Sequence, residues 1–189
     1  MKNIIRGSLM LILLTLSTAS KPATAAVAND ISLDGIWNFI PDPAATLKIG
    51  TLPSGATVRP INVPGSWQSE FTDLRDYSGV AWYWRSITLA VPPAGQVVLL
   101  RFGAVDYLAE VYFNGQKVGS HEGGYLPFEF DVTPLVRAGE NQIAVRVVDS
   151  GAKPNEVVEG IKYSEIPHGK QNWYVQTSGL WQSAELDYR

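Results

Sequence analysis

One short segment combines side chains suited to recognising a sugar. Gln171 and Asn172 carry planar amides, and Trp173 follows them with an indole. An amide donates and accepts hydrogen bonds together, which suits neighbouring hydroxyls, and an aromatic face can cover the apolar side of a sugar ring. In the simpler alternative, Trp173 belongs to the core and both amides are solvated. The residues alone leave both interpretations open.

A second loop, from Asp76 to Trp82, brings Tyr77 and Trp82 close together in sequence. Tyr77 and Trp82 are further candidates for contact with a sugar ring. The chain has six Trp and eight Tyr, and for most of them we expect core packing, because large aromatic side chains are usually well buried.

The carboxylates do not predict a hydrolytic pair. Glycoside hydrolysis generally needs two carboxyl groups, about 5–5.5 Å apart for retention or about 6.5–9.5 Å apart for inversion. No two acidic residues are placed by sequence in such a relationship, so no catalytic residue is predicted. We expect solvated surface positions for all of them, because Asp and Glu are rarely buried. The acidic residues considered are Asp73, Asp76, Asp106, Glu110, Glu122, Asp149, Glu156, Glu159 and Glu165.

The sequence gives little indication of a metal site or of a catalytic nucleophile. His121 and His168 are the only histidines and cysteine is absent, which disfavours a His/Cys metal site. A calcium site built from oxygens alone stays possible, although no calcium-loop pattern occurs. No G-x-S-x-G segment predicts a nucleophilic serine. We therefore predict no metal ligand and no cofactor.

The composition indicates one globular domain. The chain has 189 residues, of which 46% are hydrophobic and 17% charged, so it can bury a sizeable core. The net charge is −3 and no run of basic residues occurs, so nucleic acid is not an expected partner.

Residues 1–28 are typical of a secretory signal peptide. Lys2 and Arg6 precede an apolar run from Leu9 to Leu16 that is too short to span a bilayer. Small residues then provide two cleavage candidates, at 23–25 and 26–28. We expect export to the periplasm or the exterior and no membrane span. Without cysteine, the exported domain at 29–189 has to fold without disulfides.

Alternating apolar residues predict a sheet in the middle of the chain. Tyr107, Ala109, Val111 and Phe113 form one face of a strand, while Asp106, Glu110 and Asn114 are expected to point away. Asn114-Gly115 is the pair that a tight type I′ hairpin turn prefers, and a return strand follows from Gln116.

Further short strands complete the predicted fold. They are expected at 33–39, 58–63, 82–91, 96–102, 128–131, 142–148, 173–176 and 180–188, with one helical turn within 66–76 and a long aperiodic stretch at 150–172. Short strands joined by frequent turns predict an all-β fold, specifically an antiparallel β-sandwich of jelly-roll type.

Four segments, taken in order, resemble the N-terminal sugar-binding, galactose-binding-like domain of glycoside hydrolase family 2, which includes β-galactosidases, β-glucuronidases and β-mannosidases. The resemblance covers the chain from about Leu33 to its end. The segments read AWYWRSITLAVP (81–92), LRFGAVDYLAEVYFNGQKVGSHEGGYLPFEFDVT (100–133), NQIAVRV (141–147) and GKQNWYVQTSGLWQSAEL (169–186).

The resemblance implies a carbohydrate-binding role without catalysis. In that family the two catalytic glutamates belong to a later (β/α)₈ barrel, and this sequence has no βα repeats. A family loop just before the "SG" segment reaches the barrel's active site, and some members carry an acidic residue close to where this chain has Gln171, Asn172 and Trp173. The region from Trp67 to Trp82 reaches the same pocket in some members.

We therefore expect the sugar-binding domain of an exported β-glycosidase. Its partners would be a β-glycoside and the Ig-like and barrel domains of a parent enzyme, of which this chain would be a truncated form or a fragment. A free-standing carbohydrate-binding module and a structural or protein-interaction sandwich without a sugar site are the alternatives.

Overall fold

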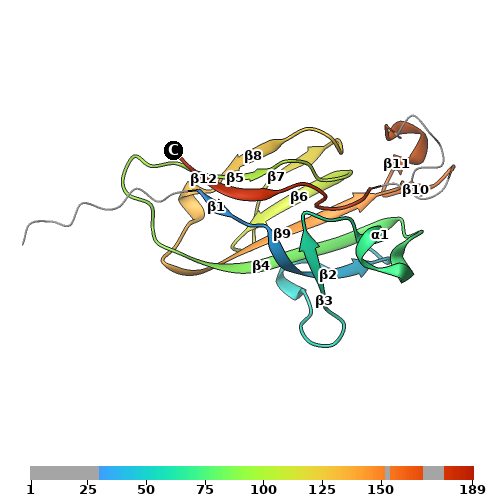
Figure 1. The fold of residues 1–189 in the computed structure, drawn as a ribbon, viewed down its shortest axis with the longest axis horizontal. Helices are drawn as coiled ribbons and strands as arrows, with labels where there is room; N and C mark the ends of the chain where they lie inside the picture. Colours follow the sequence, from blue (N-terminus) through green and yellow to red (C-terminus); the bar gives the residue numbers. More distant parts are fainter. Residues whose placement is uncertain (1–29, 152–153, 168–176) are drawn as a thin grey trace, which may run out of the picture.

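The computed structural model describes residues 30–151, 154–167 and 177–189. This part of the chain forms an all-β, antiparallel β-sandwich of jelly-roll type, which confirms the predicted fold class. Figure 1 shows the two main sheets facing each other. The short helix α1 (Trp67–Glu70) and the hairpin of β10 (Val157–Val158) and β11 (Ile161–Lys162) lie at the same end of the sandwich.

The larger sheet has six strands in the order β3-β2-β4-β9-β6-β7. All neighbours pair antiparallel, and β4 pairs with β9 along its whole length. The strands are β2 (Gly35–Asp42), β3 (Arg59–Val63), β4 (Gly79–Leu89), β6 (Leu108–Phe113), β7 (Gln116–Glu122) and β9 (Gly139–Asp149).

The smaller sheet has four strands in the order β1-β12-β5-β8. These strands are β1 (Ile31–Ser32), β5 (Val98–Phe102), β8 (Phe128–Asp131) and β12 (Ala184–Tyr188). Short 3₁₀ turns lie at η1 (Ile49–Thr51), η2 (Thr72–Leu74), η3 (Thr133–Leu135) and η4 (Tyr163–Glu165). Among the described residues, no helix has the length and apolar character needed to cross a membrane.

The core lies between the inner faces of the two sheets. The predicted alternation is confirmed on β6, where Ala109, Val111 and Phe113 are fully buried. Trp37 and Phe39 lie on the same inward face of β2, and Phe39 packs edge-on against Tyr83 of β4, with ring centroids 5.0 Å apart. Burial of these large rings removes much apolar surface from water and so stabilises the core.

The hairpin between β6 and β7 has the predicted turn. Asn114 has φ 50° and Gly115 has φ 81°, and positive φ at both central residues is what a type I′ turn requires. The amide side chain of Asn114 also donates to the backbone oxygen of Leu135, at 2.8 Å, and so ties the turn to a neighbouring loop.

The outer face of the larger sheet has an apolar cluster of its own. Trp82 and Trp84 of β4 form it together with Val80, Ala144 and Val148. The connection from β2 to β3, residues 43–58, lies over this face, and Figure 1 shows it as the loop below β2 and β3. Its apolar side chains pack against the cluster, and they are Leu47, Ile49, Leu52 and Val58.

The expected helical turn within 66–76 is present as α1. The last third of the chain, in contrast, differs in part from the sequence prediction. The stretch at 150–172, predicted to lack regular structure, contains a small hairpin of β10 (Val157–Val158) and β11 (Ile161–Lys162). The final strand begins at Ala184 rather than at Leu180. The strand predicted at 173–176 lies outside the described residues.

Candidate functional site

The predicted sugar contacts Gln171, Asn172 and Trp173 lie outside the described residues. The structure does describe the residues that follow this segment, from Thr177 onward. Ser178, near the start of this part, contacts Asp149 at the end of the sandwich where β9 finishes and β4 begins at Gly79. The side chains gathered at this end therefore form the described part of the candidate site.

Tyr77 lies at this end and is already engaged with the protein. Its hydroxyl donates to the backbone oxygen of Val80 at 2.6 Å, and its backbone oxygen accepts from Nε1 of Trp67 at 3.3 Å. Burial, with a smaller effect from the nearby charge of Asp42, raises the pKa of Tyr77 to about 12. Tyr77 thus positions the loop, and its contact with sugar stays a prediction.

Trp82 occupies the outer-face cluster rather than this end of the sandwich. Its side chain is 1% exposed and its ring packs against Tyr112, with centroids 5.6 Å apart. In the described structure the ring is therefore covered by other side chains of the protein. The described structure therefore does not bring Trp82 together with Tyr77, and the sugar contact predicted for Trp82 stays untested.

A polar cluster joins three parts of the chain beside the predicted loop. The hydroxyl of Ser178 donates to Oδ2 of Asp149, and Nε2 of Gln68 donates to that same hydroxyl. Oε1 of Gln68 accepts from the backbone N–H of Ser178 at 3.2 Å. The cluster therefore ties residues following the predicted loop to the end of β9 and to α1.

Asp106 corrects a prediction. The alternation in sequence placed it on the solvent face, but it is fully buried. It lies before β6 begins and pairs instead with Gly179, since Asp106 N–H donates to Gly179 O at 3.0 Å and Gly179 N–H donates to Asp106 O at 2.7 Å. Because β6 begins only at Leu108, the alternation of the strand does not extend to this side chain.

Asp149 corrects the same expectation for the carboxylates, because it is 1% exposed. It stands at the end of β9, where the strand's apolar run stops. Asp106 and Asp149 both act on Tyr125: burial raises the pKa of the Tyr125 phenol, and the two negative charges raise it further. The two buried carboxylates thus belong to one electrostatic neighbourhood, which no spacing in the sequence indicates.

One glycine, Gly124, and the aromatic pair of Tyr125 and Trp181 pack beside these carboxylates. Gly124 lies so near Asp106 that a side-chain carbon at this position would overlap its carboxyl group. The backbone oxygen of Gly124 accepts from Nε1 of Trp181 at 2.8 Å, and the Trp181 ring lies edge-on to the half-exposed ring of Tyr125, with centroids 5.8 Å apart.

These groups suit positioning rather than bond cleavage. Ser178, Asp149 and Gln68 are engaged with one another, so they hold backbone in place at the foot of the predicted loop. Across 30–151, 154–167 and 177–189, no three His, Asp or Glu side chains are grouped as a metal site would need. The arrangement can fix a loop and present it to a ligand.

Comparison with known proteins gives one family. The model described as "Glycosyl hydrolases family 2, sugar binding domain" matches residues 31–183. The β-glucuronidase of Streptococcus agalactiae is 29% identical over 166 residues, and the match covers 84% of this chain and 24% of that protein. The β-galactosidase of Thermoanaerobacter pseudethanolicus is 45% identical over 74 residues, covering 38% of this chain and 10% of that protein.

A solved structure agrees with these relatives. The β-glucuronidase of Bifidobacterium dentium, complexed with coumarin-3-O-glucuronide, superposes with a TM-score of 0.64 at 34% identity. The match covers 84% of this chain and 29% of the bifidobacterial one. The chain thus spans less than a third of each of these three proteins.

Proposed function

The chain belongs to glycosyl hydrolase family 2 through its sugar-binding domain, and we propose that it serves as the non-catalytic, carbohydrate-binding part of an exported β-glycosidase. The match to the bifidobacterial enzyme carries the proposal, because it extends over most of this chain but only 29% of that one. The catalytic carboxylates would come from the remainder of such a parent enzyme, in a barrel domain that follows an Ig-like domain.

We propose a β-glucuronide as the substrate class to test first. The streptococcal relative is a β-glucuronidase, and the bifidobacterial structure holds a glucuronide. A β-galactoside is the second class to test, since the Thermoanaerobacter relative is a β-galactosidase.

In this proposal the segment 168–173 orients the terminal sugar. Asn172 and Gln171 would pair with hydroxyls, and the indole of Trp173 would cover an apolar sugar face. The contacts among Asp149, Ser178 and Gln68 support this role, because they hold the chain just after the segment. A positioning group of this kind accelerates the reaction by restricting the substrate to a productive geometry.

The decisive experiment is steady-state kinetics on a polypeptide that contains this chain and its catalytic barrel, with aryl β-glucuronide as substrate. Asn172→Ala and Trp173→Ala are expected to lower kcat/KM at least tenfold while the melting temperature stays unchanged. Gln116→Ala, an exposed amide on β7, is the control.

Two results would contradict the assignment. One is unchanged kinetics for Asn172→Ala together with loss of folding for Trp173→Ala, which would make Trp173 a core residue. The other is turnover of aryl β-glycosides by residues 29–189 alone that is lost on mutating a single glutamate of this chain, because a positioning domain has no catalytic carboxylate pair of its own.

Export is part of the proposal and has its own test. The basic start, the short apolar run and the small-residue cleavage candidates of residues 1–28 support it. Mass spectrometry of protein recovered from outside the cytoplasm should show a new N-terminus near Ala26 or Asn29. Exported soluble protein that still begins at Met1 would refute processing.

A further inference from the structure

We propose that the outer face of the larger sheet carries a second saccharide-binding site, separate from the end of the sandwich described above. The site is the groove formed by Asn38, Ser54, Trp84, Arg137, Glu140 and Gln142, called here the outer-face groove. Its ligand would be a short oligosaccharide of neutral sugars. The proposal does not depend on the role assigned to residues 168–173.

The groove is a hollow of suitable size. One cavity of about 260 Å³ lies between Asn38 and the loop at Ser54, and one of about 530 Å³ continues to Arg137 and Gln142. Both include Trp84, so they adjoin at its side chain. Volumes of this order match those of small-molecule sites, which usually occupy about 300–1,000 Å³. The two cavities together offer space for more than one sugar ring.

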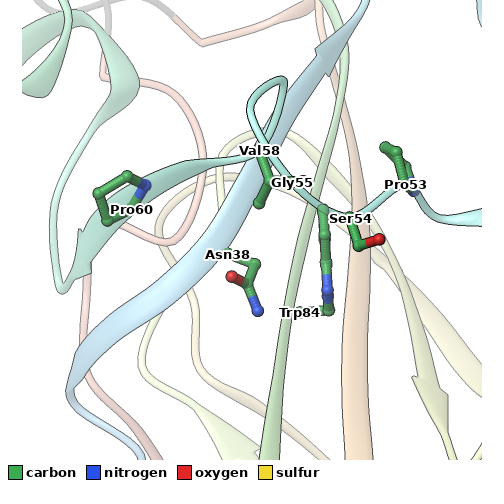
Figure 2. A pocket seen from close by; sticks show the side chains of 7 residues that line it. All are labelled: Asn38, Pro53, Ser54, Gly55, Val58, Pro60 and Trp84. Atoms are coloured by element: carbon green, nitrogen blue, oxygen red, sulfur yellow. The ribbon is translucent and has the colours of Figure 1, made fainter.

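The strand register explains why these side chains converge. Asn38 of β2 pairs with Trp84 of β4, and Trp84 pairs with Ala144 of β9, two residues from Gln142. Residues two apart on a strand share a face, so Gln142 lies on the same outer face as Ala144. Figure 2 shows the indole of Trp84 between the side chains of Asn38 and Ser54.

Unused hydrogen-bonding groups line the groove. Trp84 is 8% exposed, yet its Nε1 donates to no group in the described part of the chain, whereas Nε1 of Trp37 donates to a backbone oxygen at 2.8 Å. The side-chain amides of Asn38 and Gln142 are likewise without a partner among the described residues. Two amides and an indole N–H offer both donors and acceptors to sugar hydroxyls.

One amide at the rim of the groove differs from the amides that line it. Asn114, at its rim, already donates to Leu135 O at 2.8 Å and to Oδ1 of Asn141 at 2.9 Å, and its own oxygen accepts from the N–H of Gln142. The fold therefore satisfies the amide that supports the turn and leaves free the amides that face the hollow. An amide that the fold does not use keeps its donors and its acceptor available to a ligand.

The charges favour a neutral saccharide. Arg137 and Glu140 bring one positive and one negative group to the groove. Nε of Arg137 donates to the backbone oxygen of Glu140 at 2.9 Å, which holds the guanidinium at the rim. A balanced pair gives no strong attraction for an acidic or basic ligand, and both groups can hydrogen-bond to hydroxyls.

The wall of the groove is fixed in advance. The carboxylate of Asp42 is 4% exposed and accepts from the N–H groups of Thr46 and Leu47, at 3.1 and 2.9 Å. Leu52 and Val58 pack on the outer-face cluster, and they flank the segment that carries Ser54. A wall held at both ends loses little freedom on binding, which favours affinity.

The groove is remote from the candidate site at the other end of the sheet. Gln142 and Asp149 are seven residues apart on β9, which at the usual strand rise is about 23 Å. Binding at the groove would hold the protein on a polysaccharide without occupying the terminal-sugar pocket. Such a second contact raises the effective concentration of nearby chain ends.

Two-dimensional ¹H–¹⁵N NMR titration of residues 29–189 tests the proposal. The probes are β-1,4-linked trisaccharides of glucose, mannose and xylose, each tested to about 10 mM, since the expected dissociation constant for one of them is about 1 mM. At least one probe should shift the indole N–H signal of Trp84 and the side-chain amide signals of Asn38 and Gln142, with saturation.

Variants separate the groove from the end of the sandwich. Asn38→Ala and Gln142→Ala should weaken binding at least fivefold without changing the melting temperature, and Trp84→Phe should weaken it by removing the indole donor. Asn62→Ala, an exposed amide outside the groove that donates to Glu70, is the matched control. Asn172→Ala and Trp173→Ala should leave this binding unchanged.

Two results would overturn the proposal. One is that no probe produces a saturable shift. The other is that shifts occur only around Asp149 and Ser178 and persist in Asn38→Ala and Gln142→Ala. The second result would support the proposed positioning role while removing the groove as a site, so the two assignments fail separately.

Discussion

The hydroxyl of Ser178 donates a hydrogen bond to Oδ2 of Asp149, a carboxylate that is 1% exposed at the end of β9. The two residues are 29 positions apart, and the intervening chain contains the hairpin β10–β11 and the segment with the predicted sugar contacts. The hydrogen bond therefore holds the residues at the two ends of this intervening chain, Asp149 and Ser178, next to each other.

We predict that Ser178→Ala lowers the free energy of unfolding by about 1–3 kcal/mol, because it removes a hydrogen bond to a buried charged group. Urea denaturation at neutral pH measures the change. Ser120→Ala, an exposed serine on β7, is the control and should change the free energy by less than about 0.5 kcal/mol. Equal values for the two variants would show that the Ser178 hydroxyl does not stabilise the fold.

We predict that Gly124→Ala is destabilising by about 1–3 kcal/mol, since the added methyl group would overlap the buried carboxyl group of Asp106. Gly50→Ala is the matched control, because no atom lies within 4 Å of the position that its Cβ would take and its φ is not positive. Thermal unfolding of both variants tests the prediction. A melting temperature for Gly124→Ala as high as that of Gly50→Ala would contradict the close packing at this end.

The sandwich could be predicted from the sequence because strands and tight turns leave signals in neighbouring residues. The alternation at Ala109, Val111 and Phe113 and the Asn114-Gly115 pair determine a strand and its turn from neighbouring residues. Asp106 was wrongly assigned to solvent because the same alternation was extended beyond the start of β6. Its actual partner, Gly179, is 73 residues away, and no periodicity links them.

The candidate sites depend even more on distant contacts. Ser178, Asp149 and Gln68 meet only because α1 and the end of β9 lie at the same end of the sandwich. Trp84 was expected in a strand, but its groove exists only because the 43–58 connection packs on one part of the outer face. Neither arrangement has a signal in a single sequence.

We predict that Gly115→Val costs about 1–3 kcal/mol of stability, because a β-branched residue is strained at φ 81°. Steric crowding does not explain the cost, since no atom lies within 4 Å of the position of an added Cβ. Gly115→Asn should recover most of the loss, because Asn tolerates positive φ far better than Val. An unchanged melting temperature for Gly115→Val would mean that the turn relaxes to another type at no cost.

We predict that Tyr77→Phe changes how stability depends on alkaline pH. Burial raises the pKa of Tyr77 from 10.0 to about 12 in the folded protein, so its stabilising contribution is complete below pH 10 and is lost as the pH rises toward 12. Phenylalanine cannot ionise, and at neutral pH the variant should be less stable by about 1 kcal/mol through loss of the hydrogen bond to Val80.

The deficit of Tyr77→Phe should therefore shrink as the pH rises from 10 toward 12. Burial also raises the pKa of Tyr83, but that phenol is present in both proteins, so the difference between them isolates Tyr77. Urea denaturation of both proteins at about pH 8 and about pH 11 gives the comparison. A deficit that is equal at the two pH values would show that the Tyr77 phenol ionises alike in the folded and unfolded chains, and its burial would then not stabilise the neutral form.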